Sequence, residues 1–423
     1  LGEEEFIKDL GIFSDLKFRI GYGLAGNNRI GSYQSLALMN SVTAANGNGA
    51  QAGYASRQVP NPDLKWEANK TFNVGIDFGF LNQRITFSPE FYINRSSNLL
   101  LNAKLPNSSG YTSMVINAGE TQNSGVDLTI NTANIVSKDF TWNTSVTFSH
   151  NKNKVKKLTG EDVQLYLANF GYSGAGASHQ IGVNQPLGQF YGYVTDGIVQ
   201  VDDVVEGKGI RYTKADGTEG YYKTAMGQTL KAGDVKFVDR NEDGVVDDKD
   251  KDIIGNPNPD FTYGIQTSLS WKSLTLKAAF NGVQGRDILN TGNRYINTPG
   301  MKSNNITSEA YQGMWTAENP SNLFPSANFE VQNMVMDRYV EDGSYFRCSD
   351  ITLSYVLPKS LISKIGMKNM SVFASVKNAF ILTDYSGYDP EVNSFAFDGL
   401  RPGVDMNSYP TPRSYIFGLN LTF

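Results

Sequence analysis

The sequence predicts an all-β protein, an antiparallel transmembrane β-barrel, on the strength of three observations. Alternation of apolar and polar residues recurs along most of the 423 residues. Most of the alternating segments are nine to eleven residues long, and a tilted strand needs about ten residues to cross the apolar part of a bilayer. Their polar positions carry Gly, Asn, Ser and Thr more often than charged residues. This suits strands with one face in lipid and the other in a crowded or watery interior.

Composition narrows the class further. Charged residues make up 19% of the chain, against about 25% in a typical soluble domain. The net charge of -5 offers no basic surface for nucleic acid. No apolar run reaches the roughly 18 residues of a spanning helix, and only helices and closed barrels can cross a membrane. The single cysteine, Cys348, excludes a disulfide within the chain, and we expect it to be a small packed residue at a strand start.

Ten segments carry the alternation. In the first, Phe18, Ile20 and Tyr22 alternate with Arg19 and Gly21. Side chains that alternate in this way lie on opposite faces of a strand. The ten predicted strands are 16–24, 72–80, 85–93, 126–130, 140–148, 261–271, 274–280, 351–357, 372–376 and 415–423.

Short turns and long connections join these strands. Residues 81–83 and 272–273 are predicted hairpin turns, whereas 26–70, 150–260 and 282–345 are predicted to be long irregular loops. Outer-membrane barrels have short turns on one side and long loops on the other. A soluble β-sandwich also alternates, but loops of this length would be costly to order in a compact sandwich. The barrel is the favoured interpretation.

Six stretches, in order along the chain, resemble the SusC/RagA family of TonB-linked outer-membrane transporters. The last residue, Phe423, is an aromatic, as in barrels of that family. The six stretches are Phe13–Asn27, Asn61–Glu67, Gly188–Gly197, Gly255–Phe261, Asp342–Arg347 and Asp384–Glu391.

This resemblance implies a 22-stranded barrel in the bacterial outer membrane, filled by an N-terminal plug and capped by a SusD-like lipoprotein. The TonB–ExbB–ExbD complex would supply energy through the plug. Residues 1–423 would then be the C-terminal part of the barrel, with about half of its strands and without the plug or N-terminal domains. Because lipid cannot satisfy open sheet edges, we expect the remaining strands in a preceding part of the protein.

The implied function is TonB-dependent import of a bulky nutrient, an oligosaccharide or an oligopeptide. An alternative is a structural or adhesin barrel that transports nothing, and a third is a secreted calcium-dependent glycan-binding protein. We expect no enzyme, because the sequence has no nucleophile elbow, phosphate-binding loop or convincing carboxylate pair. Asp384, Asp389 and Glu391 stand among turn-forming residues, which favours a structural role in a loop.

One stretch, residues 239–250, has the spacing of a calcium-binding loop. Gly244 occupies the sixth position, where such loops turn sharply, and the twelfth position carries Asp where Glu is usual. Clustered hard oxygen ligands suit Ca²⁺ better than a transition metal. The alternative is an acidic surface turn without a metal. The predicted ligands of a structural Ca²⁺ are Asp239, Asn241, Asp243, Val245 (through its carbonyl), Asp247 and Asp250.

Overall fold

The computed structural model describes residues 4–5, 9, 11–28, 32–45, 47, 49–158, 165–167, 177–298, 305–327, 334–363, 366–396 and 398–422. They fall into two compact units. The first comprises Leu1–Leu128, Asn151–Gln164 and Gly182–Pro186, and the second comprises Thr129–His150, Leu165–Ile181 and Leu187–Phe423. The predicted final aromatic, Phe423, lies outside the described residues.

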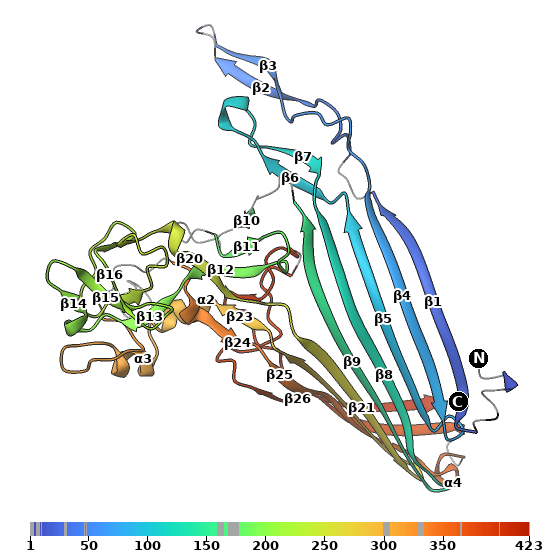
Figure 1. Ribbon diagram of the computed structural model, residues 1–423. Helices are drawn as coiled ribbons and strands as arrows, with labels where there is room; N and C mark the ends of the chain where they lie inside the picture. Colours follow the sequence, from blue (N-terminus) through green and yellow to red (C-terminus); the bar gives the residue numbers. More distant parts are fainter. Residues whose placement is uncertain are drawn as a thin grey trace. The chain divides into compact units, whose positions relative to one another are not determined.

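Ten long strands form one antiparallel sheet, in the order β1-β4-β5-β8-β9-β21-β22-β25-β26-β28 (Figure 1). Every predicted strand is confirmed, and apart from inserted short elements each strand pairs with the next along the chain. Within the described residues β1 and β28 have one neighbour each, so this part of the barrel is not closed. The strands are β1 (Phe13–Asn27), β4 (Glu67–Phe80), β5 (Ile85–Ser97), β8 (Glu120–Val136), β9 (Phe140–Lys157), β21 (Phe261–Trp271), β22 (Leu274–Gln284), β25 (Tyr345–Val356), β26 (Asn369–Thr383) and β28 (Ser414–Thr422).

The two faces of this sheet differ in chemistry. Ile20 and Phe91, which both pair with Val74 of β4, have 66% and 44% of their surface exposed. One residue along, on the opposite face, Arg19 pairs with Asp77 at 3.0 Å and reaches the Glu90 carboxylate at 2.8 Å. Large apolar side chains exposed in a row on one face are what a lipid-facing strand needs.

Both predicted hairpin turns are confirmed. Between β4 and β5, Leu81, Asn82 and Gln83 all have positive φ, from 52° to 64°. The Ser14 hydroxyl oxygen accepts the Gln83 N–H at 3.0 Å, which helps to hold this strained turn. Between β21 and β22 the turn residue Lys272 has φ 53°. Among the described residues, no helix has the length and apolar character to cross a membrane.

The prediction that the long connections are irregular is wrong, because each holds short regular elements. Two hairpins lie near one end of β1, β4 and β5 (Figure 1). They are β2 (Met39–Ala45) with β3 (Ala50–Ser56), and β6 (Leu100–Lys104) with β7 (Ser113–Asn117). The β6–β7 hairpin also holds the 3-10 turn η1 (Asn107–Ser109). Later connections contain β23 (Asp287–Asn290), α2 (Thr291–Ile296), α3 (Ser308–Gly313), the 3-10 turn η4 (Asp337–Tyr339), β24 (Val340–Asp342), α4 (Lys359–Ile362) and β27 (Val404–Asp405).

The largest difference from the sequence prediction is in residues 187–255, which form a compact segment that we call the loop domain. Its core holds the fully buried Phe190, Tyr222 and Phe237, and Met336 from a later connection packs into the same cluster. A separate apolar core explains why this segment folds compactly. Two short strands precede the loop domain and join its first sheet: β10 (Leu165–Leu167) and β11 (His179–Ile181). The elements of the loop domain itself are β12 (Gln189–Tyr193), β13 (Thr195–Ile198), η2 (Val201–Asp203), β14 (Val204–Val205), β15 (Gly209–Thr213), β16 (Glu219–Tyr222), β17 (Thr224–Ala225), β18 (Val235–Phe237), β19 (Val245–Val246), η3 (Asp248–Asp250) and β20 (Lys251–Gly255).

Candidate functional site

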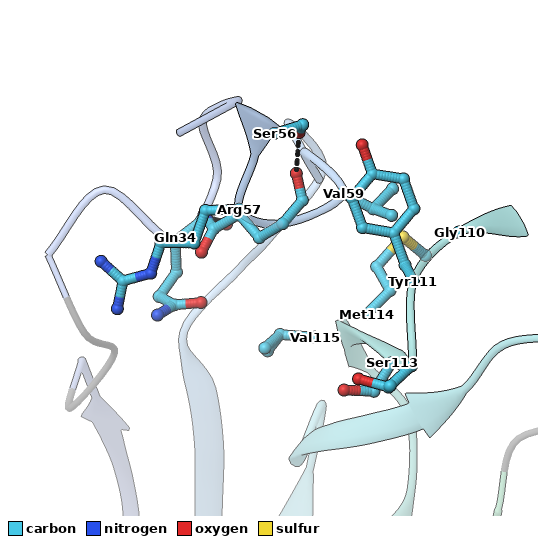
Figure 2. A pocket seen from close by; sticks show the side chains of 11 residues that line it. Gln34, Ser56, Arg57, Val59, Gly110, Tyr111, Ser113, Met114 and Val115 are labelled. Carbon is cyan, nitrogen blue, oxygen red and sulfur yellow. Dashed lines mark hydrogen bonds between the residues drawn. The ribbon is translucent and has the colours of Figure 1, made fainter. Parts of the chain in front are cut away.

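A polar pocket of about 330 Å³ lies among the hairpins of the first unit (Figure 2). It is formed by the segment after β1, the end of β3 and the segment leading into β7. Gln58 helps to shape it, because its amide donates to the backbone oxygens of Tyr33 at 3.2 Å and Leu36 at 2.9 Å. The lining residues are Gln34, Ser56, Arg57, Gln58, Val59, Gly110, Tyr111, Thr112, Ser113, Met114 and Val115.

The stretch Asn61–Glu67 supports this pocket. The Asn61 amide donates to the carbonyl of Val115 at 2.8 Å, and the Asn117 amide donates to the carbonyl of Lys65 at 2.7 Å. Arg57 is exposed and forms no ion pair within the described part of the chain. A free guanidinium beside amide and hydroxyl groups can hydrogen-bond to carboxylate, carbonyl or sugar oxygens. The sequence did not identify this pocket, because its walls are far apart along the chain.

A second pocket, of about 290 Å³, lies in the second unit and is rich in amides. Asn322 has a structural role, because its side-chain oxygen accepts the Ile198 N–H at 2.9 Å. Arg338 is also anchored, through a hydrogen bond to the backbone carbonyl of Leu323. The pocket's walls are Thr195, Gly197, Asn293, Asn297, Asn322, Leu323, Phe324, Arg338 and Tyr339.

The predicted calcium loop, residues 239–250, lies between β18 and β20 and is here called the acidic loop. Asp239 and Asp250 are buried, with 2% and 0% of their surface exposed. One Asp239 carboxylate oxygen accepts the Gly244 N–H at 2.8 Å, and the other is buried without a hydrogen-bond partner. Asp250 accepts the N–H groups of Arg240 at 2.9 Å and Asp247 at 2.7 Å.

The other predicted ligands shape turns in the same loop. The Asn241 side-chain oxygen accepts the Asp243 N–H at 2.9 Å, and Asp243 accepts the Val245 N–H at 3.0 Å. Asp247 caps η3 by accepting the Lys249 N–H at 2.8 Å. Within the described residues, no three His, Cys, Asp or Glu side chains are grouped so that they alone could hold a metal ion. A cation here would therefore need amide or backbone oxygens as well.

Burial changes the acid–base properties of the acidic loop. Desolvation raises the pKa of the Asp239 carboxyl, and the nearby charge of Asp250 raises it further. Desolvation also raises the pKa of Tyr212 to about 12, with the Asp239 charge contributing. The Tyr212 hydroxyl donates to the backbone carbonyl of Asp239 at 2.7 Å in a buried position. The acidic loop is thus fixed to the core of the loop domain.

A buried ionic cluster joins strand β25 to the last long connection. Arg347, whose side chain is 6% exposed, donates to the Asp389 carboxylate, and the Glu391 carboxylate lies 3.7 Å from its Nε. Glu391 also accepts the Tyr345 hydroxyl at 2.7 Å. The structural role predicted for Asp389 and Glu391 is consistent with these contacts. The expectation that Cys348 is packed at a strand start is confirmed, since it is fully buried near the start of β25.

Comparison with known proteins identifies the family to which this chain is related. Residues 12–234 match the family model described as TonB dependent receptor-like, beta-barrel. The whole chain is 31% identical to TonB-dependent receptor P3 of Formosa agariphila and 32% identical to TonB-dependent receptor SusC of Bacteroides thetaiotaomicron, covering 41% and 39% of those proteins. The chain therefore spans about two fifths of the length of the curated relatives it matches.

Solved structures agree with this assignment. The structure of the RagAB peptide transporter superposes with a TM-score of 0.76 at 25% identity, over 97% of this chain and 41% of that one. The RagAB peptide importer in its "closed-closed" state gives a TM-score of 0.78 at 24% identity, over 99% of this chain and 42% of that one. Proteins of this family are outer-membrane receptors and transporters, not enzymes. The 423 residues therefore belong to the TonB-dependent receptor family and form part of its outer-membrane β-barrel.

Proposed function

We propose that the protein to which these residues belong imports a bulky nutrient across the outer membrane with energy delivered through TonB. The observation that carries this proposal is the match of the entire chain, at 31–32% identity, to proteins named TonB-dependent receptors. The likeness of the fold to the RagAB peptide transporter supports the proposal independently of the sequence matches. The ten strands of the sheet supply part of the barrel wall that such a transporter requires.

We further propose that a SusD-like lipoprotein covers the loop end of the barrel and that the TonB–ExbB–ExbD complex acts through a plug. The resemblance to SusC and the likeness to RagAB support this partnership. The loop domain and the hairpins β2–β3 and β6–β7 add folded surface beyond the sheet, which suits a partner that docks on the loops.

The proposed cargo is an oligosaccharide or an oligopeptide. The likeness to the RagAB peptide transporter favours peptides. The two pockets carry amide, hydroxyl, aromatic and guanidinium groups, and such groups recognise both kinds of polar chain. Arg57 distinguishes the two through charge, because a peptide offers a carboxylate and a neutral glycan does not.

The test is uptake by the source bacterium with the complete gene deleted, and with the deletion complemented. Labelled oligosaccharides and oligopeptides are supplied separately. We expect the deletion to abolish uptake of one class, the intact gene to restore it, and loss of TonB to abolish it again. Unchanged uptake of every cargo in the deletion strain would refute import. Uptake that persists without TonB would refute the energy source.

A further inference from the structure

We propose that the acidic loop is a Ca²⁺ site in which Asp239 and Asp250 are the anchoring ligands, and that the ion stabilises the loop domain. This inference is independent of what the transporter carries. The decisive observation is the unpartnered oxygen of Asp239, which is buried in a residue with only 2% of its surface exposed. A buried carboxylate oxygen without a donor is costly, and a bound cation would remove that cost.

The net charge of the acidic loop also favours a bound cation. The acidic loop contains six acidic residues and two basic ones, a net charge of -4 (6 against 2). Among the described residues neither Asp239 nor Asp250 forms an ion pair. The basic side chains in and beside the acidic loop pair with other carboxylates: Arg240 with Asp252, Lys249 with Asp243 and Asp247, and Lys251 with Asp248. Two adjacent buried carboxylates without a counter-charge are an arrangement that protein interiors avoid.

The available donors select a hard cation. Besides the two carboxylates, the loop offers the Asn241 side-chain oxygen and backbone oxygens such as the Val245 carbonyl. Ca²⁺ accepts six to eight oxygen ligands in flexible geometry, whereas Mg²⁺ demands a near-ideal octahedron. An all-oxygen set spread over twelve residues therefore favours Ca²⁺ over Mg²⁺ and over transition metals.

The position of the acidic loop explains what the ion would do. The backbone of Asp239 is held by the Tyr212 hydroxyl, and Asp248 accepts the Tyr193 hydroxyl at 3.2 Å. Val245 and Val246 form β19, which pairs in parallel with β17. An ion bound between Asp239 and Asp250 would close a loop that is already joined at both ends to the core of the loop domain. Binding only the folded state, it would stabilise that domain by mass action.

The experiment uses the complete protein, purified in detergent and stripped of divalent ions by EGTA. Calcium chloride is titrated by calorimetry, and thermal unfolding is followed with and without Ca²⁺. The variants are Asp239→Asn and Asp250→Asn. The control is Asp216→Asn, an exposed aspartate in a turn of the same loop domain that accepts the Thr218 N–H at 2.9 Å.

We expect the wild type and Asp216→Asn to bind Ca²⁺ at a site whose occupancy raises the melting temperature, with Mg²⁺ a weaker competitor. Asp239→Asn and Asp250→Asn should weaken that site by roughly 100-fold, because ligand charge sets calcium affinity. Neutralising an ion-free buried carboxylate also removes a destabilising charge. In EGTA, Asp239→Asn should therefore melt no lower than the wild type, so its loss of calcium response cannot be attributed to misfolding. A wild type that binds no Ca²⁺, or binding unchanged by Asp239→Asn, would overturn the proposal.

Discussion

Arg347 carries a buried positive charge that is paired with the Asp389 carboxylate. It stands near the start of β25 with its side chain 6% exposed, and its partner Asp389 is 11% exposed. Removing one partner of a buried pair leaves an uncompensated charge, which costs about 3–5 kcal/mol. We therefore expect Arg347→Ala to lower the free energy of unfolding by that amount. Arg347→Lys should be milder, because it keeps the charge and loses only the planar fork.

The measurement is thermal unfolding of the complete protein, combined with limited proteolysis of the connection that carries Asp389. The matched control is Arg401→Ala, which breaks a half-exposed pair with Asp398 in the same connection. Exposed pairs contribute less than about 1 kcal/mol. Equal effects of Arg347→Ala and Arg401→Ala would show that the buried cluster does not stabilise this connection.

His179 makes stability depend on pH. Burial lowers its pKa to about 4, and it is held between the Ser178 hydroxyl, which donates to Nδ1 at 2.8 Å, and the Pro402 carbonyl, which accepts from Nε2 at 3.1 Å. Between pH 6.5 and 4 the unfolded chain binds a proton that the folded chain does not. This contribution is complete above pH 6.5 and is lost as pH falls, by about 2 kcal/mol at pH 5.

Melting curves between pH 7 and pH 5 test this effect. His179→Gln keeps a donor and an acceptor but cannot take up a proton, so its stability should fall less with decreasing pH than that of the wild type. His150→Gln, at an exposed position of β9, is the control. Parallel pH profiles for the wild type and His179→Gln would contradict the assignment.

Some residue roles could be predicted from the sequence and others could not. The burial of Cys348 followed from its place at the start of an alternating segment, and the turn chemistry around Asp389 predicted a structural role. The partner of Asp389 could not be predicted, because Arg347 lies 42 residues away and its position is set by the sheet register. The spacing of oxygen-bearing residues in 239–250 predicted a calcium-binding loop. The burial of Asp239 could not be predicted from that spacing, because it depends on the core of the loop domain.

Elements were predictable in proportion to their length. The ten sheet strands are 9 to 18 residues long, so several cycles of alternation are visible in each. The strands of the loop domain have two to five residues, such as β17 (Thr224–Ala225) and β12 (Gln189–Tyr193). Two to five residues show at most two cycles, too few to separate a strand from a loop. The loop domain was therefore missed although it has a core of fully buried residues such as Phe190 and Phe237.

The apolar face of the strands gives a prediction at the scale of an element. Phe91 lies at the centre of β5, pairs with Val74 of β4, and is 44% exposed. If this face lies in lipid, Phe91→Arg should destabilise the folded barrel by about 2–4 kcal/mol, the cost of an arginine at the bilayer midplane. The measurement is denaturant unfolding of the complete protein in lipid vesicles. Phe91→Leu is the control, and an equally small effect of both changes would exclude lipid contact there.

At the scale of the whole molecule, the chain combines a membrane wall with a folded loop region. The wall is a sheet with an apolar face and a face that carries ion pairs such as Arg19–Asp77. In the second unit, the loop domain gathers at one end of β21, β25 and β26, and α4 lies at the other end (Figure 1).

The central claim is that the sheet separates lipid from a polar interior, and spin labels on β5 test it most directly. Single cysteines are placed at each position from 88 to 94 of the complete protein, in a Cys348→Ala background, and the labelled protein is inserted into lipid bilayers. Collision rates with oxygen and with a water-soluble nickel chelate are then measured. The account predicts a period of two, with labels at 89, 91 and 93 in lipid and those at 88, 90, 92 and 94 shielded from it. Equal access of the nickel chelate to both sets would contradict the barrel assignment.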